Sequence, residues 1–85
     1  MYLDQIEVKI LRTLAGRGYM PATTIAETVG HHQQIVRSRL RGMARFGWVE
    51  RGGWGQGFGH DWGRYRITQA GRHELAQREQ LRFVV

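Results

Sequence analysis

Arginine is the residue with the clearest chemical potential in this chain of 85 residues. Each of the thirteen basic residues except Lys9 is arginine, and only seven residues are acidic, so the net charge is +6 and the isoelectric point is near 11.1. The guanidinium group is a planar donor fork that matches both phosphate oxygens and the edge of guanine. A small basic domain of this kind points to a polyanionic partner, most commonly nucleic acid.

The densest arginine cluster lies in the segment HHQQIVRSRLRGMARFG. One side of the segment is apolar at helical spacing; its candidates are Ile35 or Val36, Leu40, Met43 and Phe46. The other side is polar and has no acid, so we expect a helix over about residues 31–46 whose outer face lies in the major groove, where glutamine can bind adenine and arginine can bind guanine. The predicted DNA contacts are Gln33, Gln34, Arg37, Ser38, Arg41 and Arg45, the last to phosphate. Arg39 is expected to point to an earlier helix, and a solvated basic face is the alternative for the whole helix.

Two threonines lie at the start of the preceding helix, in YMPATTIAETVG. Pro21 suits a helix start, and the short apolar stripe after it predicts a helix over about residues 22–29. The hydroxyls and free backbone N–H groups of Thr23 and Thr24 can hold a phosphate there. They can equally serve as plain helix caps, and the sequence leaves both interpretations open.

The stretch RGGWGQGFGHDWGRYRIT, residues 51–68, combines glycines with aromatic residues that recur at every fourth position. On either side, WVER (48–51) and RYRI (64–67) alternate apolar and charged residues, which predicts two short strands. A phosphate-binding P-loop would need G-x-x-x-x-G-K-[ST], and the stretch has no lysine. A dinucleotide site would need a third glycine at the G-x-G-x-x-G spacing. We therefore expect a hairpin wing over about residues 48–67.

This wing is expected to supply the second set of DNA contacts. Its glycines allow the backbone to turn sharply and to approach a partner closely. Arginines at the stem would reach the DNA backbone, polar residues near the tip would enter a minor groove, and two aromatic rings would stack, wedge or bind a protein. The predicted contacts are, in that order, Arg51, Arg64 and Arg66, then Gln56 and His60, then Trp54 and Phe58. Trp48 and Trp62 are expected to join the protein's own core.

Other chemistry is excluded by residue type. The chain has no cysteine, which removes disulfides and thiolate metal sites. Its four histidines form no zinc-ligand pattern, and there are no paired acids, nucleophile motif or cofactor motif. The sequence therefore predicts a protein that is not an enzyme and holds no metal or cofactor. With no apolar run long enough to span a membrane and no signal peptide pattern, we expect a cytoplasmic, nucleoid-associated protein.

The elements follow one another in a simple order. A helix over about residues 3–15 comes first, because its apolar residues fall at helical spacing. The two helices and two strands described above follow, and a last helix begins after Thr68, a plausible cap. The predicted fold class is α+β, with three helices, a two-stranded β-hairpin wing and a C-terminal helix in a single domain over residues 1–85.

This ordered set of motifs resembles the winged helix-turn-helix superfamily, most nearly small regulators of the MarR type. The matching segments are ILRTLAGRGYMPATTIAETVG, IVRSRLRGMARFGWVER and YRITQAGRHELA, which cover nearly the whole chain. Such domains have a small residue within the second helix, here Ala26, and a glycine at the turn, here Gly30. A motif Y-x-[LI]-T-x-x-G follows the wing, here ending at Gly71. The resemblance implies that the third helix is the DNA-recognition helix.

Three features depart from the MarR pattern. The chain lacks room for both the extra dimer helices and the effector pocket of full MarR proteins, so we expect no effector-binding role. The predicted wing is longer and richer in aromatic residues than is common in such domains. His31 and His32 stand where a serine or threonine usually caps the recognition helix.

We therefore predict sequence-specific binding of double-stranded DNA by a small transcriptional regulator. One minimal domain offers a small interface, so a homodimer through the first and last helices is expected. The spare apolar residues for it are Val8, Leu81, Phe83 and Val84. Two alternatives remain open: a protein-interaction module that uses the aromatic wing, and a binder of single-stranded nucleic acid.

Overall fold

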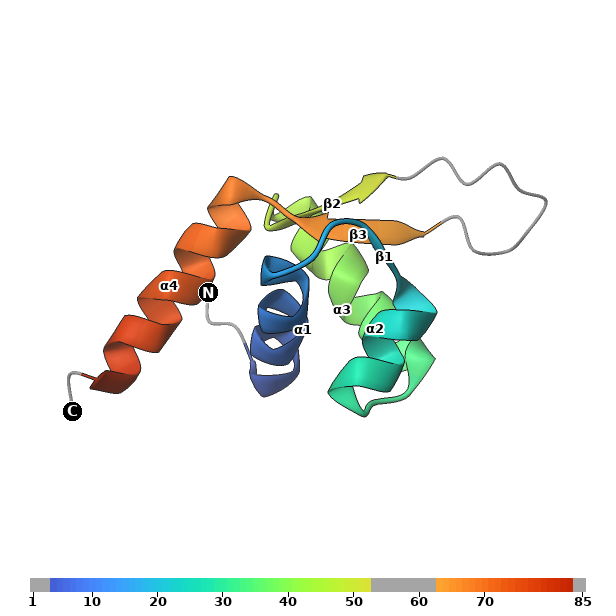
Figure 1. Ribbon diagram of the computed structural model, residues 1–85, viewed down its shortest axis with the longest axis horizontal. Coiled ribbons are helices and arrows are strands. Elements are labelled where there is room, and N and C mark those ends of the chain that lie inside the picture. The colour runs from blue at the N-terminus through green and yellow to red at the C-terminus, as the bar shows by residue number, and fades with distance from the viewer. Residues whose placement is uncertain (1–3, 53–62, 84–85) are drawn as a thin grey trace.

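A computed structural model of the chain describes residues 4–52 and 63–83, and for residues 80–83 only the course of the helix (Figure 1). Its elements are, in chain order, α1 (Gln5–Ala15), β1 (Met20–Pro21), α2 (Ala22–Val29), α3 (Gln33–Arg45), β2 (Val49–Gly52), β3 (Arg64–Ile67) and α4 (Gln69–Phe83). The predicted α+β class is confirmed. A third short strand, β1, joins the two predicted strands.

The three described strands form one antiparallel sheet in the order β1-β3-β2. Met20 lies opposite Tyr65, and Pro21 lies opposite Arg64. Pro21 has no N–H to donate, which restricts its strand to an edge of the sheet. The pairing ties the residues just before α2 to the β2–β3 hairpin.

Caps and glycines set the ends of the first three helices. The Asp4 carboxylate accepts a hydrogen bond from the backbone N–H of Glu7 at 2.8 Å, and the Glu7 carboxylate accepts one from the Asp4 N–H at 3.0 Å, a reciprocal capping box. Gly30 ends α2 with a φ of 76°, and Gly47 follows α3 with a φ of 79°. α1 and α3 begin two residues later than predicted, because Asp4 and His32 are caps.

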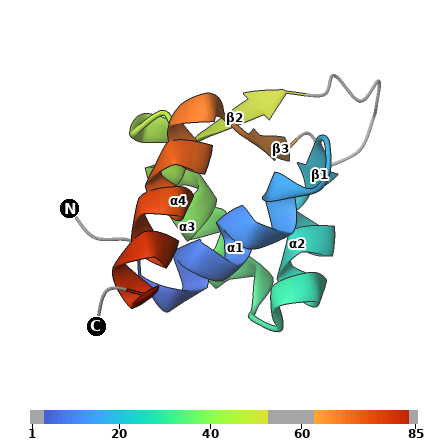
Figure 2. The same ribbon diagram turned by 60° about the vertical axis from the view of Figure 1, so that its left-hand side comes forward.

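The core lies between the helices and the inner face of the sheet. α1 packs against α2, α3, α4 and β3, and Figure 2 shows it in the middle of the helical layer. The largest fully buried side chains are Ile10, Leu11, Leu14, Ile25, Val36, Leu40, Met43 and Val49. The inward residue at the start of α3 is thus Val36, whereas Ile35 is exposed.

The end of α3 corrects one expectation and fulfils another. Phe46 does not extend the inward stripe of α3: it lies just past the last helical turn and its side chain is half exposed. Its ring stacks on Trp48, with centroids 4.8 Å apart and an interplanar angle of 18°. Trp48 is buried in the core, as predicted.

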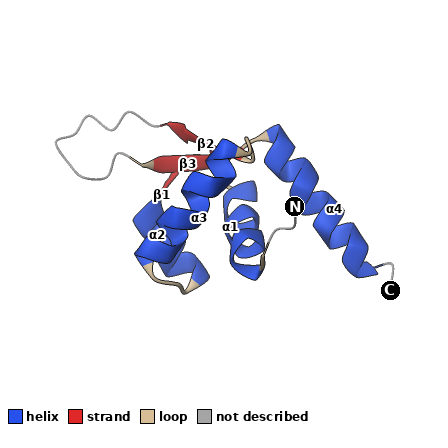
Figure 3. Ribbon diagram, turned by 180° about the vertical axis from the view of Figure 1, so that it is seen from behind, coloured by secondary structure: helices blue, strands red, loops and turns tan. Residues whose placement is uncertain are grey.

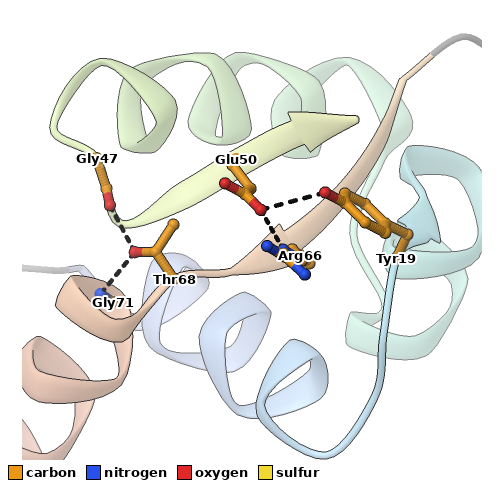
Figure 4. Close-up of polar contacts among 6 residues, drawn as sticks. All are labelled: Tyr19, Gly47, Glu50, Arg66, Thr68 and Gly71. Atoms are coloured by element: carbon orange, nitrogen blue, oxygen red, sulfur yellow. Dashed lines mark hydrogen bonds and ion pairs between the residues drawn. The ribbon is translucent and has the colours of Figure 1, made fainter. Parts of the chain in front are cut away.

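Thr68 and Gly71 join α4 to the rest of the domain (Figure 4). The Thr68 hydroxyl donates to the carbonyl oxygen of Gly47 at 2.5 Å and accepts from the backbone N–H of Gly71 at 3.0 Å, so Thr68 caps α4 as predicted. Gly71 lies so close to the preceding turn that a Cβ there would overlap the carbonyl oxygen of Trp48. Further along α4, a guanidinium nitrogen of Arg72 donates to the carbonyl oxygen of Ala15 at 3.0 Å.

Candidate nucleic-acid interface

α3 presents a polar face opposite its buried stripe. In Figure 3 the helix crosses the near side of the molecule, from the turn after α2 towards the base of β2. A helix advances about 100° per residue, so the positions farthest from the buried Val36, Leu40 and Met43 form one outer stripe. The predicted contact residues that are exposed on α3 are Gln33, Gln34, Ser38, Arg41 and Arg45. α3 contains no acidic residue, so the only charges on this face are the positive ones of its arginines.

The ring of His32 caps α3. Its Nδ1 atom accepts a hydrogen bond from the backbone N–H of Gln34 at 3.1 Å. This satisfies one of the N–H groups that the first turn of a helix leaves without a partner, the role that serine or threonine usually fills. The bond requires the ring proton to lie on Nε2. The cap fixes the orientation of the first turn of α3, which carries the two glutamines.

A groove of about 810 Å³ is lined by α2, the turn after it and the start of α3. Its lining residues are Thr23, Ala26, Glu27, Gly30, His31, His32, Gln33, Gln34 and Arg37. Arg37 is half-buried on the flank of α3 that faces this groove, and its Nε atom is enclosed without a hydrogen-bond partner among the described residues. Burying an unsatisfied donor is unfavourable, so an acceptor from a partner molecule would stabilise this arrangement. Arg37 is therefore placed beside the outer stripe of α3, not on it.

The structure bears on one of the two interpretations of the threonines, the helix cap. The N-cap of α2 is Pro21, which forms no side-chain cap, and neither Thr23 nor Thr24 lies in the capping position. The backbone N–H of Ala22 donates to the carbonyl oxygen of Gly63 at 3.2 Å. Plain helix capping is thus not the role of the two hydroxyls. Thr23 lies at the edge of the groove described above.

Arg39 is accounted for within the protein. Its Nε atom lies 3.0 Å from a carboxylate oxygen of Asp4, at the start of α1. This agrees with the expectation that Arg39 points to an earlier helix. The pair is more than two-fifths exposed at both side chains, so it neutralises charge more than it stabilises the fold.

The arginines at the stem of the β2–β3 hairpin lie on opposite faces of the sheet. Paired residues of antiparallel strands share a face, so Arg51 lies on the inner face with its partner Tyr65, and Arg66 lies on the outer face with its partner Glu50. Arg64 shares the outer face with Arg66. All three arginines are exposed.

On the outer face, Glu50 forms an ion pair with the Nε atom of Arg66 and accepts a hydrogen bond from the Tyr19 hydroxyl at 3.1 Å (Figure 4). The Arg66 guanidinium also lies over the Tyr19 ring, 5.0 Å from its centroid. The ring fits against the backbone of Gly52, where a Cβ would approach it within 2.8 Å. This Tyr19–Glu50–Arg66 cluster connects the segment before β1 to both strands of the hairpin, and it balances the charge of Arg66.

Comparison with known proteins finds solved structures that share this fold. No family model and no curated protein matches the chain. A MarR-family transcriptional regulator from Silicibacter pomeroyi superposes with a TM-score of 0.77 at 23% identity, over 88% of this chain and 49% of that one. The transcriptional repressor CouR, bound to a 23-mer DNA duplex, gives a TM-score of 0.78 at 21% identity, over 93% of this chain and 54% of that one. The chain has a winged-helix fold of the MarR type.

The winged helix spans about half the length of the two solved chains that it matches. In winged-helix terms, α2 and α3 are the two helices of the helix-turn-helix, and β2 and β3 are the stem of the wing. Ile35, an alternative to Val36 for the inward stripe in the sequence analysis, lies instead on the exposed side of α3, and its exposure is 43%. The tip residues Trp54, Gln56, Phe58 and His60, and also Trp62, lie outside the described residues.

Two findings concern metal ligands and membrane-spanning helices in the described residues. Within residues 4–52 and 63–83, no three histidine, cysteine, aspartate or glutamate side chains gather where they could hold a metal ion. The same part of the chain has no helix that is both long and apolar enough to cross a membrane.

Proposed function

We propose that this winged helix binds double-stranded DNA sequence-specifically as a small transcriptional regulator, with α3 in the major groove. The observation that carries the proposal is the outer face of α3. It combines glutamines and arginines, whose side chains can read adenine and guanine, with the absence of any acid along the helix. The likeness to a MarR-family regulator and to a DNA-bound repressor supports this choice for the same fold.

Phosphate contacts are proposed at the two ends of this surface. Thr23 and Thr24 lie in the first turn of α2, where backbone N–H groups and hydroxyls favour an anion. Arg37, with its enclosed Nε atom, lines the adjoining groove. Arg45 lies at the opposite end of α3 and is exposed. Such contacts fix the register of the helix on the duplex, while Gln34, Ser38 and Arg41 read base edges.

We further propose that two copies bind together, through α1 and α4. A two-fold pair places two recognition helices on half-sites about one helical turn apart. Of the spare apolar residues, Val8 is partly buried against the core of its own protomer, so it contributes less than expected. The side chains of Leu81 and Phe83, and all of Val84, lie outside the described residues.

The proposed function is tested by selecting bound duplexes from a random pool and titrating the selected duplex at several salt concentrations. We expect a specific site, and affinity that falls steeply as salt rises, because arginine–phosphate contacts release counterions. An enriched single strand, or salt-independent capture of a protein in place of DNA, would overturn the proposal and favour one of the two alternatives.

Arg41→Ala tests the recognition helix directly. Removing one good base contact should weaken specific binding by about 1–3 kcal/mol while the protein remains folded. Lys9→Ala is the matched control, because it removes one exposed positive charge from α1, outside the α2–α3 unit. Equal affinity of the Arg41→Ala protein and its parent at fixed salt would show that α3 does not read the DNA in this way.

A further inference from the structure

Ile35 is exposed to solvent, and no contact among the described residues accounts for its place on the surface. Among the described residues, three large apolar side chains are exposed, Tyr19 by 39%, Ile35 by 43% and Phe46 by 50%. Tyr19 is held by Glu50 and Arg66, and Phe46 stacks on Trp48. Nothing comparable accounts for Ile35, which belongs neither to the core cluster nor to the partly buried side chains that pack against it in the described part of the chain.

The position of Ile35 places it among the base-reading candidates. It is the third residue of α3 and therefore lies in the N-terminal half of the helix, the half that faces base edges in helix-turn-helix proteins. Ser38 and Gly42 follow at three and seven residues, so the three positions form one row along the helix surface. Gln34 precedes Ile35 directly and lies on the neighbouring row. An apolar side chain is thus inserted into an otherwise polar surface.

Gly42, farther along the same row, leaves space for a close partner. Glycine in a helix interior is about 1 kcal/mol less favourable than alanine. Within residues 4–52 and 63–83, a Cβ at Gly42 would meet nothing within 4 Å, so no contact in this part of the chain requires a glycine there. A glycine without an internal need is consistent with close approach of a bound molecule to the helix backbone. Ile35 and Gly42 together give this row a raised apolar end and a flat end.

We propose that Ile35 reads a thymine through the 5-methyl group of that base. This inference rests on the proposed function. In the major groove, thymine is the only base that presents a methyl group, and an apolar side chain is its complement. The β-branched isoleucine side chain has few rotamers in a helix, so little conformational entropy is lost when it is held against the methyl. The contact discriminates thymine from cytosine, which presents an amino group at the adjoining ring position.

The test combines a change in the protein with a change in the DNA. Each thymine of the selected duplex is replaced in turn by deoxyuridine, which keeps the hydrogen-bonding edge and removes only the methyl group. We expect the parent protein to lose about fourfold in affinity at one thymine per half-site, the effect of one buried methyl-sized group. Ile35→Ala should lose a similar factor on the thymine duplex and be insensitive to deoxyuridine at that position.

Two controls keep the result interpretable. Ile35→Ala should not unfold the protein, because the side chain is exposed and alanine is the better helix former; its melting curve checks this. Gln34→Ala, one residue away, should lower affinity for the thymine and deoxyuridine duplexes by the same factor. The inference is overturned if no thymine methyl couples to Ile35, or if Gln34→Ala shows the same coupling, while specific binding by the parent leaves the proposed function standing. If the parent binds no duplex, both fail.

Discussion

Gly71 lies in the first turn of α4, but the need for a glycine there comes from contacts with residues outside that helix. From the sequence it weakens the first turn of α4, since glycine is a poor helix former. In the structure, α4 begins against the turn that precedes β2, and the space where a Cβ would stand is filled by the carbonyl oxygen of Trp48 and by Ile67, whose Cγ1 would be 2.9 Å away. Thr68 holds this approach through its bonds to Gly47 and Gly71. The T-x-x-G spacing is therefore a joint between α4 and the turn before β2.

Gly71→Ala should lower the free energy of unfolding by about 1–3 kcal/mol, because the added methyl meets a backbone atom that cannot rotate away. The effect would appear as a lower melting temperature in circular dichroism. Gly42→Ala is the matched control, since it also replaces a helical glycine but meets open space; it should raise stability by up to about 1 kcal/mol. Equal melting temperatures for the two variants would contradict the proposed joint.

At the scale of elements, strand register decides what each wing arginine can do. Alternation along β3 shows that Arg64 and Arg66 share a face. It cannot relate Arg51 to them, because neither strand's sequence by itself determines the register between the two strands. The observed pairing puts Arg51 on the inner face with Tyr65, and Arg66 on the outer face with Glu50. The three stem arginines are therefore not equivalent candidates for DNA contact.

We expect Arg51→Ala to weaken duplex binding and to reduce the slope of log affinity against log salt by about one, the loss of one phosphate contact. Arg66→Ala removes the same charge from the next strand but should leave that slope nearly unchanged, because Glu50 already balances Arg66. Its stability cost should stay below about 1 kcal/mol, as for exposed pairs generally. Titrations of both variants at three salt concentrations measure the two slopes. A larger change of slope for Arg66→Ala than for Arg51→Ala would contradict the prediction that Arg51, and not Arg66, contacts phosphate.

The start of α3 is the other element where local chemistry sets geometry. His32→Ala removes the Nδ1 acceptor and should lower stability by about 0.5–2 kcal/mol, the usual effect of losing an N-cap. His32→Ser should restore most of it, because a hydroxyl can accept the same N–H. Thermal melts of the three proteins provide the comparison. A serine variant no more stable than the alanine variant would mean that the ring contributes by packing and not by capping.

The sequence predicts much of the fold because each helix has a regular apolar stripe and a glycine or cap at its end. Where the sequence does not predict the structure, the reason can also be traced to particular residues. Ile35 and Val36 are adjacent and both fit the stripe of α3, so periodicity alone cannot choose between them. β1 has only two residues, too few for a pattern, and depends on pairing with β3. Histidine is not a usual cap, so the sequence places His31 and His32 at the start of α3 but does not predict that the His32 ring caps it. The candidate DNA contacts on α3 follow from its stripe, whereas the enclosed Nε atom of Arg37 and the pairing of Arg66 depend on tertiary packing.

At the scale of the whole molecule, α4 is fastened to the domain along one side of α1. Thr68 fixes the start of α4, and Arg72 ties its first turns to α1 by donating to the carbonyl oxygen of Ala15. Further along, the Arg12 Nε atom of α1 lies 3.8 Å from a carboxylate oxygen of Glu79. α1 is therefore covered by α4 on one side and by α2 and α3 on the others. In the dimer that we propose, the second copy would approach along the remaining surfaces of α1 and α4.

We expect the protein to be dimeric on its selected duplex, with two copies on half-sites about 10 base pairs apart. Sedimentation of the free protein and of its complex at micromolar concentration measures this directly. Inserting five base pairs between the half-sites is the control, because it rotates one site by half a helical turn and should abolish joint binding. A single copy on the duplex, indifferent to the insertion, would remove the dimer from the proposal.

The short pairing of β1 with β3 has a consequence for affinity. Because Met20 and Pro21 pair with β3 and run directly into α2, backbone pairing joins the α2–α3 unit to the stem of the wing. In the DNA complex that we propose, α3 in the major groove would hold the stem close to the neighbouring phosphates, at a high effective concentration. Binding of DNA at α3 and at the stem would then reinforce each other. A variant that loosens β1 from β3 should therefore lose more affinity for DNA than any single arginine-to-alanine variant.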